Sequence, residues 1–476
     1  MTETNPIDEA VVPQPVVRGD LTQGPVARTL LMFTLPTLGG NVLQSLNGSI
    51  SAIYVGKFLG ENAFAAAGIA TFVMFAIFSS VFGLGMSTTI LIGQAKGRGD
   101  TDEMRRTIGA TAGSFIAIGL LMSLFGGSLA PPILRWMATP AAAMPFATSF
   151  LNVVFIGVPL MFLTVLLQSA LRGIGDAATP FWTTVLNLVF SLVLNPIFIL
   201  GLGPVPELGL AGAAWAGVVT NFICLVFMLW RIYALDLPIR LRGKEFALLI
   251  PDWAHMKPVL VIGVPMGLSM VIMSLSGAVM MGLINREGVD TAAAYNAVNQ
   301  MYGYIQMPAF AVGSAVSAMA AQNIGAGRWD RIGMIARTGV ITNVLMTGVL
   351  VVVVLLADHV LLGLFLPLGS KAIPIGEHIN LLIAWTFVPM GISMVMTSIV
   401  RANGAVVVPF VILVFSIILV RMSVGFGLYP HYGSDAIWWS FMASGSASAL
   451  MGIGYYLQGG WRKGRRISAM PVAAAE

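Results

Sequence analysis

The sequence predicts an all-α integral membrane protein with twelve transmembrane helices in two six-helix lobes. Three observations predict this fold class. Of the 476 residues, 57% are hydrophobic and only 9% are charged, whereas soluble domains carry about 25% charged residues. The apolar segments are long enough for helices that cross a bilayer, about 20 residues each, and they lack the alternating pattern of barrel strands. Finally, the chain repeats itself after six segments.

The first six apolar segments form the predicted N-terminal lobe, residues 26–232. Their boundaries are roughly 29–54, 62–92, 106–130, 146–170, 178–202 and 208–231. Residues 1–25 are polar, contain several prolines and have no apolar core. We therefore expect a flexible tail there, not a cleavable signal peptide.

The second six segments form the predicted C-terminal lobe, residues 258–458. Their boundaries are roughly 258–284, 290–321, 333–357, 375–400, 407–428 and 435–458. The most polar connector, residues 233–257, is the predicted linker between the lobes. Residues 459–476 form a basic tail.

The basic residues are distributed unevenly between the two sides of the predicted membrane. Of the 25 Lys and Arg residues, those in or near the odd-numbered loops are Lys57, Arg135, Arg286, Lys371 and Arg421. The tails and the even-numbered loops hold the others. Because basic residues favour the cytoplasmic side, we expect a multi-pass protein of the cytoplasmic membrane with both termini in the cytoplasm.

The repeat relates residues about 229 positions apart. Examples are Pro36 with Pro265, Gly48 with Gly277, Arg172 with Arg401, and Pro180 with Pro409. Six spans are an even number, so both copies enter the membrane from the same side. Their pseudo-two-fold axis then lies along the membrane normal, as in alternating-access carriers. A duplicated scaffold without transport is the alternative.

Few residues are suited to catalysis or metal binding. The single cysteine, Cys224, excludes an intrachain disulfide, and none of the four histidines is paired at metal-ligand spacing. No acidic residue lies in the middle of a segment; the nearest are Asp358, Glu377 and Asp435, at segment ends. We therefore expect no enzyme, no metal site and no cofactor, apart from Na⁺ or H⁺ as a coupling ion.

Two polar stripes mark a predicted pocket in the N-terminal lobe. In the first segment the stripe spans an arc of about 120° and comprises Asn41, Gln44, Asn47 and Ser51. In the fifth segment it recurs every four residues and comprises Thr183, Asn187, Ser191 and Asn195. Neutral amide oxygens can ligate Na⁺ but cannot titrate. Interhelical hydrogen bonds that hold the lobe together are the alternative.

A third stripe lies in the eighth segment, within an arc of about 60°, and comprises Tyr295, Asn299, Tyr302 and Gln306. Aromatic faces beside amides suit a flat or cationic ligand. For Tyr295, a place at the membrane interface is the alternative. The seventh segment is rich in methionine, and Met273 is a candidate for an adaptable binding surface, with ordinary helix packing as the alternative.

Arg421 interrupts the eleventh apolar segment. A guanidinium at that depth is costly unless it reaches the interface or finds a partner. A structural role between helices and attraction of an anionic group are both open.

The order of several motifs resembles that of the multidrug and toxic compound extrusion (MATE) family. The proline-led first segment ends in AIYVGKFLG and is followed by ENAFAAAGIA. LRGIGDAATP, LNPIFILGLG and GLAGAAWAG follow in order, and the glycine-rich GQAKGRGD after the second segment has a copy, AQNIGAGRWD, after the eighth. The resemblance covers about residues 29–458. It implies cation-coupled export of amphipathic, often cationic compounds through two six-helix lobes.

The chain departs from the family pattern where the family carries membrane carboxylates. Ser51 stands where the first helix commonly has Asp, and Asn195 stands before Pro196 where many prokaryotic members have Asp. The seventh segment has no Glu. The resemblance therefore implies the export function but not coupling through these carboxylates.

The predicted function is a MATE-like antiporter that exports amphipathic compounds by alternating access. We expect a monomer in the lipid bilayer, with a small-molecule partner and no nucleic acid. The substrate-binding candidates are Asn41, Gln44, Ser51, Asn187, Asn195, Tyr295, Asn299, Tyr302, Gln306 and Met273. The alternatives are a flippase for lipid-linked precursors, which would need several Arg or Lys in its cavity, and a non-transport membrane protein.

Overall fold

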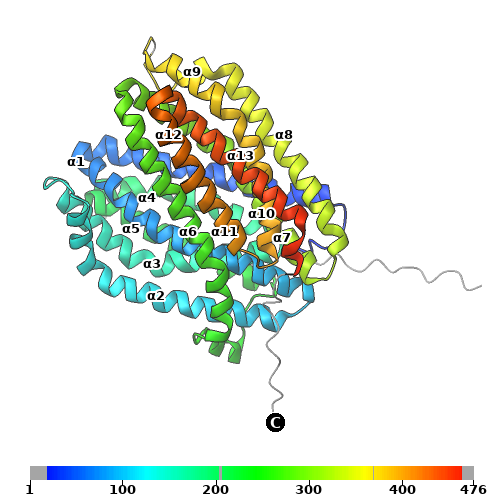
Figure 1. The fold of residues 1–476 in the computed structure, drawn as a ribbon. Helices are drawn as coiled ribbons and strands as arrows, with labels where there is room; N and C mark the ends of the chain where they lie inside the picture. Colours follow the sequence, from blue (N-terminus) through cyan, green and yellow to red (C-terminus); the bar gives the residue numbers. More distant parts are fainter. Residues whose placement is uncertain (1–18, 203–205, 368, 464–476) are drawn as a thin grey trace, which may run out of the picture.

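The computed structural model describes residues 19–202, 206–367 and 369–463, with backbone alone at 61, 62 and 463. Every regular element in this part of the chain is a helix (Figure 1). The helices of the first half are α1 (Val26–Arg98), α2 (Thr101–Trp136), α3 (Met144–Gly173), α4 (Ala178–Leu200) and α5 (Gly209–Ala234). Because α1 turns back on itself at Gly60, this half crosses the predicted membrane six times.

The turn inside α1 depends on glycine. Gly60 has φ 76° and ψ −175°, far from helical values. A side chain is strongly disfavoured at such a positive φ, whereas glycine adopts it freely. The backbone there separates two helices, and the predicted break between the first two segments is confirmed.

The second half begins after the short helix η1 (Gly243–Leu249), which packs against α2 through an Arg105–Glu245 ion pair of 2.7 Å. Its main helices are α6 (Trp253–Ile284), α7 (Val289–Gly325), α8 (Trp329–Leu362), α9 (Ala372–Ile383), α10 (Phe387–Ala402), α11 (Val407–Val414), α12 (Met422–Tyr432) and α13 (Ser434–Gln458). The short elements are η2 (Asn285–Glu287), η3 (Ala384–Thr386), the π-helix η4 (Phe415–Arg421) and η5 (Gly460–Lys463).

In this half, α9 and α10 are joined by η3 into one span, and α11 and α12 are joined by η4 into another. The described chain therefore has twelve crossings, and the predicted fold class of two six-helix lobes is confirmed. By length and hydropathy, ten of the crossings qualify as membrane spans. The other two, residues 26–59 and α13, have more polar side chains among their apolar residues.

An even number of crossings per lobe places both described chain ends on one side of the molecule, here called the terminal face. The turns between α1 and α2 and between α7 and α8 lie on the same side. The opposite side, here called the distal face, holds the turn at Gly60 and the connection between α8 and α9. Which face meets the cytoplasm stays a prediction.

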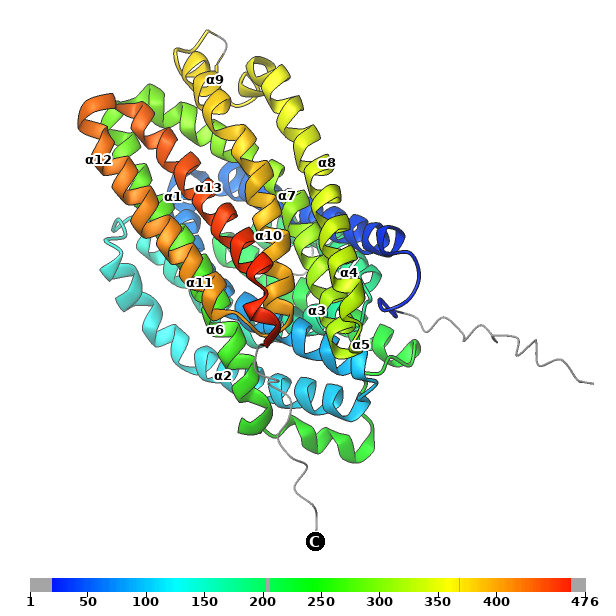
Figure 2. The ribbon, with the colours of Figure 1, turned by 45° about the vertical axis from the view of Figure 1, so that its right-hand side comes forward.

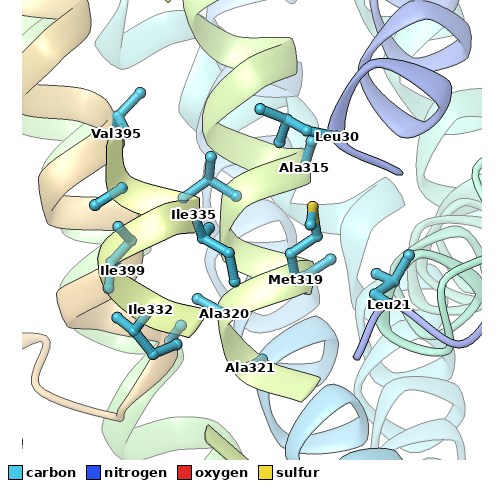
Figure 3. Packing of buried hydrophobic residues seen from close by; sticks show 14 of the residues in the cluster. Leu21, Leu30, Ala315, Met319, Ala320, Ala321, Ile332, Ile335, Val395 and Ile399 are labelled. Carbon is cyan, nitrogen blue, oxygen red and sulfur yellow. The ribbon is translucent and has the colours of Figure 1, made fainter. Parts of the chain in front are cut away.

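Among the described residues, the clusters of buried apolar side chains that join the lobes lie toward the terminal face. One shared cluster packs Leu21 and Leu30 from the start of the chain against Ala315 and Met319 of α7, with residues of α8 and α10 on the other side of α7 (Figure 3). A smaller one joins Ile90 of α1 to α6 and α11. Toward the distal face, one cluster of described residues belongs to the C-terminal lobe alone, and another belongs to the N-terminal lobe except for Met256 and Val259 at the start of α6. The two groups of helices are visible in Figure 2.

The start of the described chain differs from its prediction as a flexible tail. Residues 19–25, here called the N-terminal strap, lie between the lobes, and Leu21 is only 5% exposed. A segment this short has no hydrophobic periodicity, so the sequence alone did not indicate its packing. Residues 1–18 and 464–476 of the two predicted tails lie outside the described residues.

Candidate functional site: the surface between the lobes

Two glutamines form a reciprocal seam between the lobes at the terminal face. Gln94 of α1 donates a hydrogen bond from Nε2 to the carbonyl oxygen of Ala402 in the other lobe, at 2.6 Å. Gln322 of α7 donates in the opposite direction, from Nε2 to the carbonyl oxygen of Gly173, at 2.9 Å. The donors are related by the sequence repeat, and so are the acceptors. The seam is therefore a symmetric product of the duplication.

Glycines let the two backbones of the seam approach closely. A methyl group on Gly97 would collide with the carbonyl oxygen of Gln322, and one on Gly325 would collide with that of Gln94. Small residues commonly serve this purpose where membrane helices cross. The repeated glycine-rich motif that the sequence revealed is thus explained by packing between lobes, a role that the sequence analysis did not assign to it.

The N-terminal strap adds a second layer to the seam. The backbone N–H of Leu21 donates to Oε1 of Gln322 at 2.9 Å, and Asn323 Nδ2 donates to the carbonyl oxygen of Leu21 at 3.1 Å. Arg328 and Arg331, at the start of α8, donate to strap carbonyls at 2.8 and 3.0 Å. The amide of Gln322 therefore holds both the opposite lobe and the strap.

In the N-terminal lobe, the two predicted polar stripes meet at one point. Asn47 Nδ2 of α1 donates to Oδ1 of Asn187 in α4 at 2.9 Å. The Oδ1 of Asn47 is buried and has no hydrogen-bond partner among the described residues. Cys224 of α5 closes the group by donating to the carbonyl oxygen of Thr183 at 3.5 Å. The Asn47 group therefore has one neutral carbonyl oxygen left to accept a hydrogen bond.

Asn195 does not join this group. It is 3% exposed, and its Nδ2 donates to the carbonyl oxygen and to Oγ of Ser191, each at 2.8 Å. Asn41 and Ser51 are partly exposed and Gln44 is exposed. The structure therefore connects Asn187, but not the other N-lobe candidates, to the Asn47 group, and their roles in substrate binding stay predictions.

The stripe predicted on α7 does not face one surface. Tyr302 is 5% exposed, packs on Phe387 and donates to the carbonyl oxygen of Ile379 at 3.4 Å. Tyr295 is 9% exposed and stacks on Trp438. The core of the C-terminal lobe surrounds most of α7. The predicted stripe lies at the edge of this buried region, so some of its side chains are buried and others are exposed. The two tyrosines are therefore away from the ligand-accessible surface in this structure.

The accessible face of α7 carries other polar residues. Asn299, a predicted candidate, is exposed, and Gln306 is partly exposed. Asn296, Gln300 and Tyr304, which are not among the predicted candidates, are also exposed on this helix. Their spacing of four residues was the available signal. Because lipid cannot satisfy amide groups, this face is suited to a water-filled space between the lobes. Met273, on α6, is 38% exposed.

Carboxylates of the described spans lie near the ends of those spans. At the distal face, His359 Nδ1 lies 2.7 Å from Glu377, and His378 Nε2 lies 2.9 Å from Asp435. At the terminal face, Asp252 caps α6, and its hydrogen bond from the backbone N–H of Ala254 lowers the pKa of the carboxyl. No group of three or more potential metal ligands occurs among the residues the structure covers.

Comparisons with known proteins agree with this architecture. The MatE family model matches the chain twice, at residues 36–197 and 265–426. A probable multidrug resistance protein of Bacillus subtilis, YoeA, is 31% identical over 452 residues, which cover 94% of this chain and 97% of the relative. A probable multidrug resistance protein of Thermotoga maritima, NorM, is 22% identical and covers 92% of this chain and 94% of the relative.

Solved structures show the same fold at lower identity. One described as the outward-facing conformation of a multidrug resistance MATE family transporter of the MOP superfamily matches with a TM-score of 0.86 and 18% identity. The match covers 94% of this chain and all of that one. The two matches to the family model also confirm the predicted internal repeat, since both ends of the second match lie 229 positions after those of the first.

Proposed function

The chain belongs to the MATE family, and on that premise we propose that it exports amphipathic small molecules by alternating access. The observation that carries the proposal is the reciprocal seam of Gln94 and Gln322. It joins the lobes at one face through hydrogen bonds and close glycine contacts. The hydrogen-bonding groups are neutral side-chain amides and backbone carbonyls. Such a seam can open without exposing an unpaired buried charge, as the alternate state requires.

The orientation follows from the distribution of basic residues. We place the terminal face, with its strap and most Lys and Arg, in the cytoplasm. The lobes are then closed toward the cytoplasm and the polar face of α7 is reached from outside. Cysteines introduced at single positions on each face, and labelled from one side of intact cells, would test this. Buried Cys224 keeps the background low.

We propose that coupling does not use a carboxylate in the N-terminal lobe. Asn47, Asn187 and Asn195 supply amide groups that cannot titrate. We therefore expect a sodium gradient at uniform pH to drive export more strongly than a pH gradient at uniform sodium. Dye accumulation in inverted membrane vesicles under separately imposed gradients measures this. Transport driven by the pH gradient alone would contradict this proposal.

The export function has its own test. Overexpression of the chain in a drug-hypersensitive host should lower the accumulation of its substrate dyes, and an empty vector is the control. Unchanged accumulation of every dye in a broad panel would contradict export. We also propose that the monomer is the working unit, since each lobe pairs with the other lobe of the same chain. Light scattering of the purified protein in detergent would test this.

A further inference from the structure

Arg421 is a charged group inside a span that none of the described carboxylates neutralises. It is the last residue of the π-helix η4, in the span Val407–Tyr432. Nε donates to Ser444 Oγ at 3.0 Å and Nη1 donates to Ser276 Oγ at 3.3 Å. The guanidinium lies 4.5 Å from the ring centroid of Phe441. All three partners are neutral, so none of them compensates the positive charge of the guanidinium.

Three carboxylates of the same lobe have other partners. Glu377 and Asp435 pair with histidines at the distal face. Glu287 accepts a hydrogen bond from the hydroxyl of Tyr429. None of the described ion pairs includes Arg421. A charge at this depth that lacks a counter-ion in the protein is a typical sign of a functional site in a membrane protein.

The contacts of Arg421 leave N–H donors for a ligand. An arginine has five N–H donors in a planar fork that matches the geometry of a carboxylate or phosphate. The two serine contacts use two of these five. The π-helix that ends at Arg421 is also a feature common at functional sites.

We propose that Arg421, oriented by Ser276 and Ser444, binds an anionic group on the exported molecule, such as a carboxylate or a phosphate. This inference rests on the proposed export function and narrows its substrates to amphipathic compounds that carry a negative charge. This anionic class differs from the cationic class that the family resemblance implies. At mid-depth, the described spans contain no carboxylate that could pair with a cation, but they contain the guanidinium of Arg421, which could pair with an anion. A purely structural role for Arg421 is the competing account.

Two dyes that share a xanthene ring separate these accounts. Fluorescein is anionic at neutral pH and rhodamine 123 is cationic. With the full-length protein in proteoliposomes, the wild type should move fluorescein faster than rhodamine 123. Arg421→Gln should slow fluorescein by about tenfold or more and leave rhodamine 123 unchanged, since a charge-assisted pair is lost. Arg421→Lys should keep part of the fluorescein rate, because the charge remains without the fork.

The control is Arg462→Gln, which removes a guanidinium that stacks on Trp461 outside the spans; both dye rates should stay at the wild-type level. Equal loss of both dyes in Arg421→Gln, at unchanged melting temperature, would overturn the proposal in favour of a structural role. Transport of rhodamine 123 alone by the wild type would also overturn it. So would movement of a fluorescent phosphatidylglycerol without either dye, because the occupant would then be a lipid.

Direct binding separates this inference from the export function itself. Fluorescence polarisation of fluorescein with the purified protein should show saturable binding that Arg421→Gln abolishes. If that binding occurs but no gradient moves the dye, the Arg421 site stands and the export function fails. If the dye neither binds nor moves, while other dyes are exported, the Arg421 site fails and the export function stands.

Discussion

The two copies of the repeat are alike at the seam on the terminal face, but they differ in the polar groups deeper in the lobes. At the seam, both copies keep the same residues, and Gln94 and Gln322 make equivalent bonds across the lobes. Inside the lobes the copies have diverged. The N-terminal lobe has the neutral pair Asn47–Asn187, and the C-terminal lobe has the charged Arg421.

The difference shows which parts of the repeat are constrained by packing between lobes. A close backbone approach leaves no room for a side chain, so both copies of the seam need glycine at equivalent positions. A side chain that faces a pocket meets no such restriction, so each lobe can adapt its own chemistry. Four mutational predictions test this contrast, beginning with the largest expected effect.

Leucine at either seam glycine should have the largest effect. In Gly97→Leu and in Gly325→Leu the new side chain collides with the opposite backbone, and we expect a loss of about 3 kcal/mol or more in stability. Because the clash arises only when the lobes close at this face, export should also stop. Thermal denaturation in detergent and dye export measure the two effects.

The control for the seam glycines is Gly348→Leu, on α8, where a Cβ meets no heavy atom within 4 Å. It should be nearly neutral. Equal tolerance of leucine at Gly97, Gly325 and Gly348 would show that the seam does not depend on close approach.

Substitution of the two seam glutamines by alanine should reduce stability by different amounts, although the two residues are related by the repeat. Gln322→Ala leaves the N–H of Leu21 and the carbonyl of Gly173 without their bonds, at a cost of about 2–3 kcal/mol. Gln94→Ala removes one such bond and should cost about 1 kcal/mol. Hydrogen exchange of the N-terminal strap should rise in Gln322→Ala only. Equal exchange in the two variants would mean that the strap is held without Gln322.

Asn195→Asp should introduce a pH dependence that the wild type lacks. Burial disfavours the charged carboxylate, so the pKa of the new acid should lie above its ordinary value. When protonated, the acid can still donate to Ser191, and export should be close to wild type at low pH. As pH rises through that pKa, the donor is lost and export should fall. Asn195→Ala should be impaired equally at all pH values, and a pH-independent Asp variant would contradict the role of the donor.

The smallest effect is expected for the Asn47–Asn187 pair. A double-mutant cycle with alanine should give a coupling energy of about 0.6 kcal/mol, the usual size for a hydrogen bond between membrane helices. Denaturation in detergent measures stability, and export of a dye measures function in the same four proteins. A functional loss much larger than the coupling energy would indicate that the free oxygen of Asn47 contacts a ligand.

The fold was largely predictable because its signals are local. Long apolar segments, Gly60 between the first two of them and the two copies 229 residues apart all stand in the sequence. The candidate site was predicted less well. A stripe on a helix shows which side chains share a face, but not what that face meets. For this reason the stripe predicts a ligand surface at Tyr295 and Tyr302, whereas both side chains lie in the core of their lobe.

The sequence by itself therefore determined the membrane class, the two lobes and the absence of mid-span carboxylates at the expected positions, since composition and spacing report these properties directly. Only the tertiary structure decided that the glycine-rich motifs form a seam and that the strap packs into it. It also decided that Arg421 donates hydrogen bonds to two serines and forms no ion pair with an acid among the described residues. These contacts join residues more than 20 positions apart, in several cases about 300. Which distant segments meet is settled by packing of the whole chain, and local patterns do not carry that information.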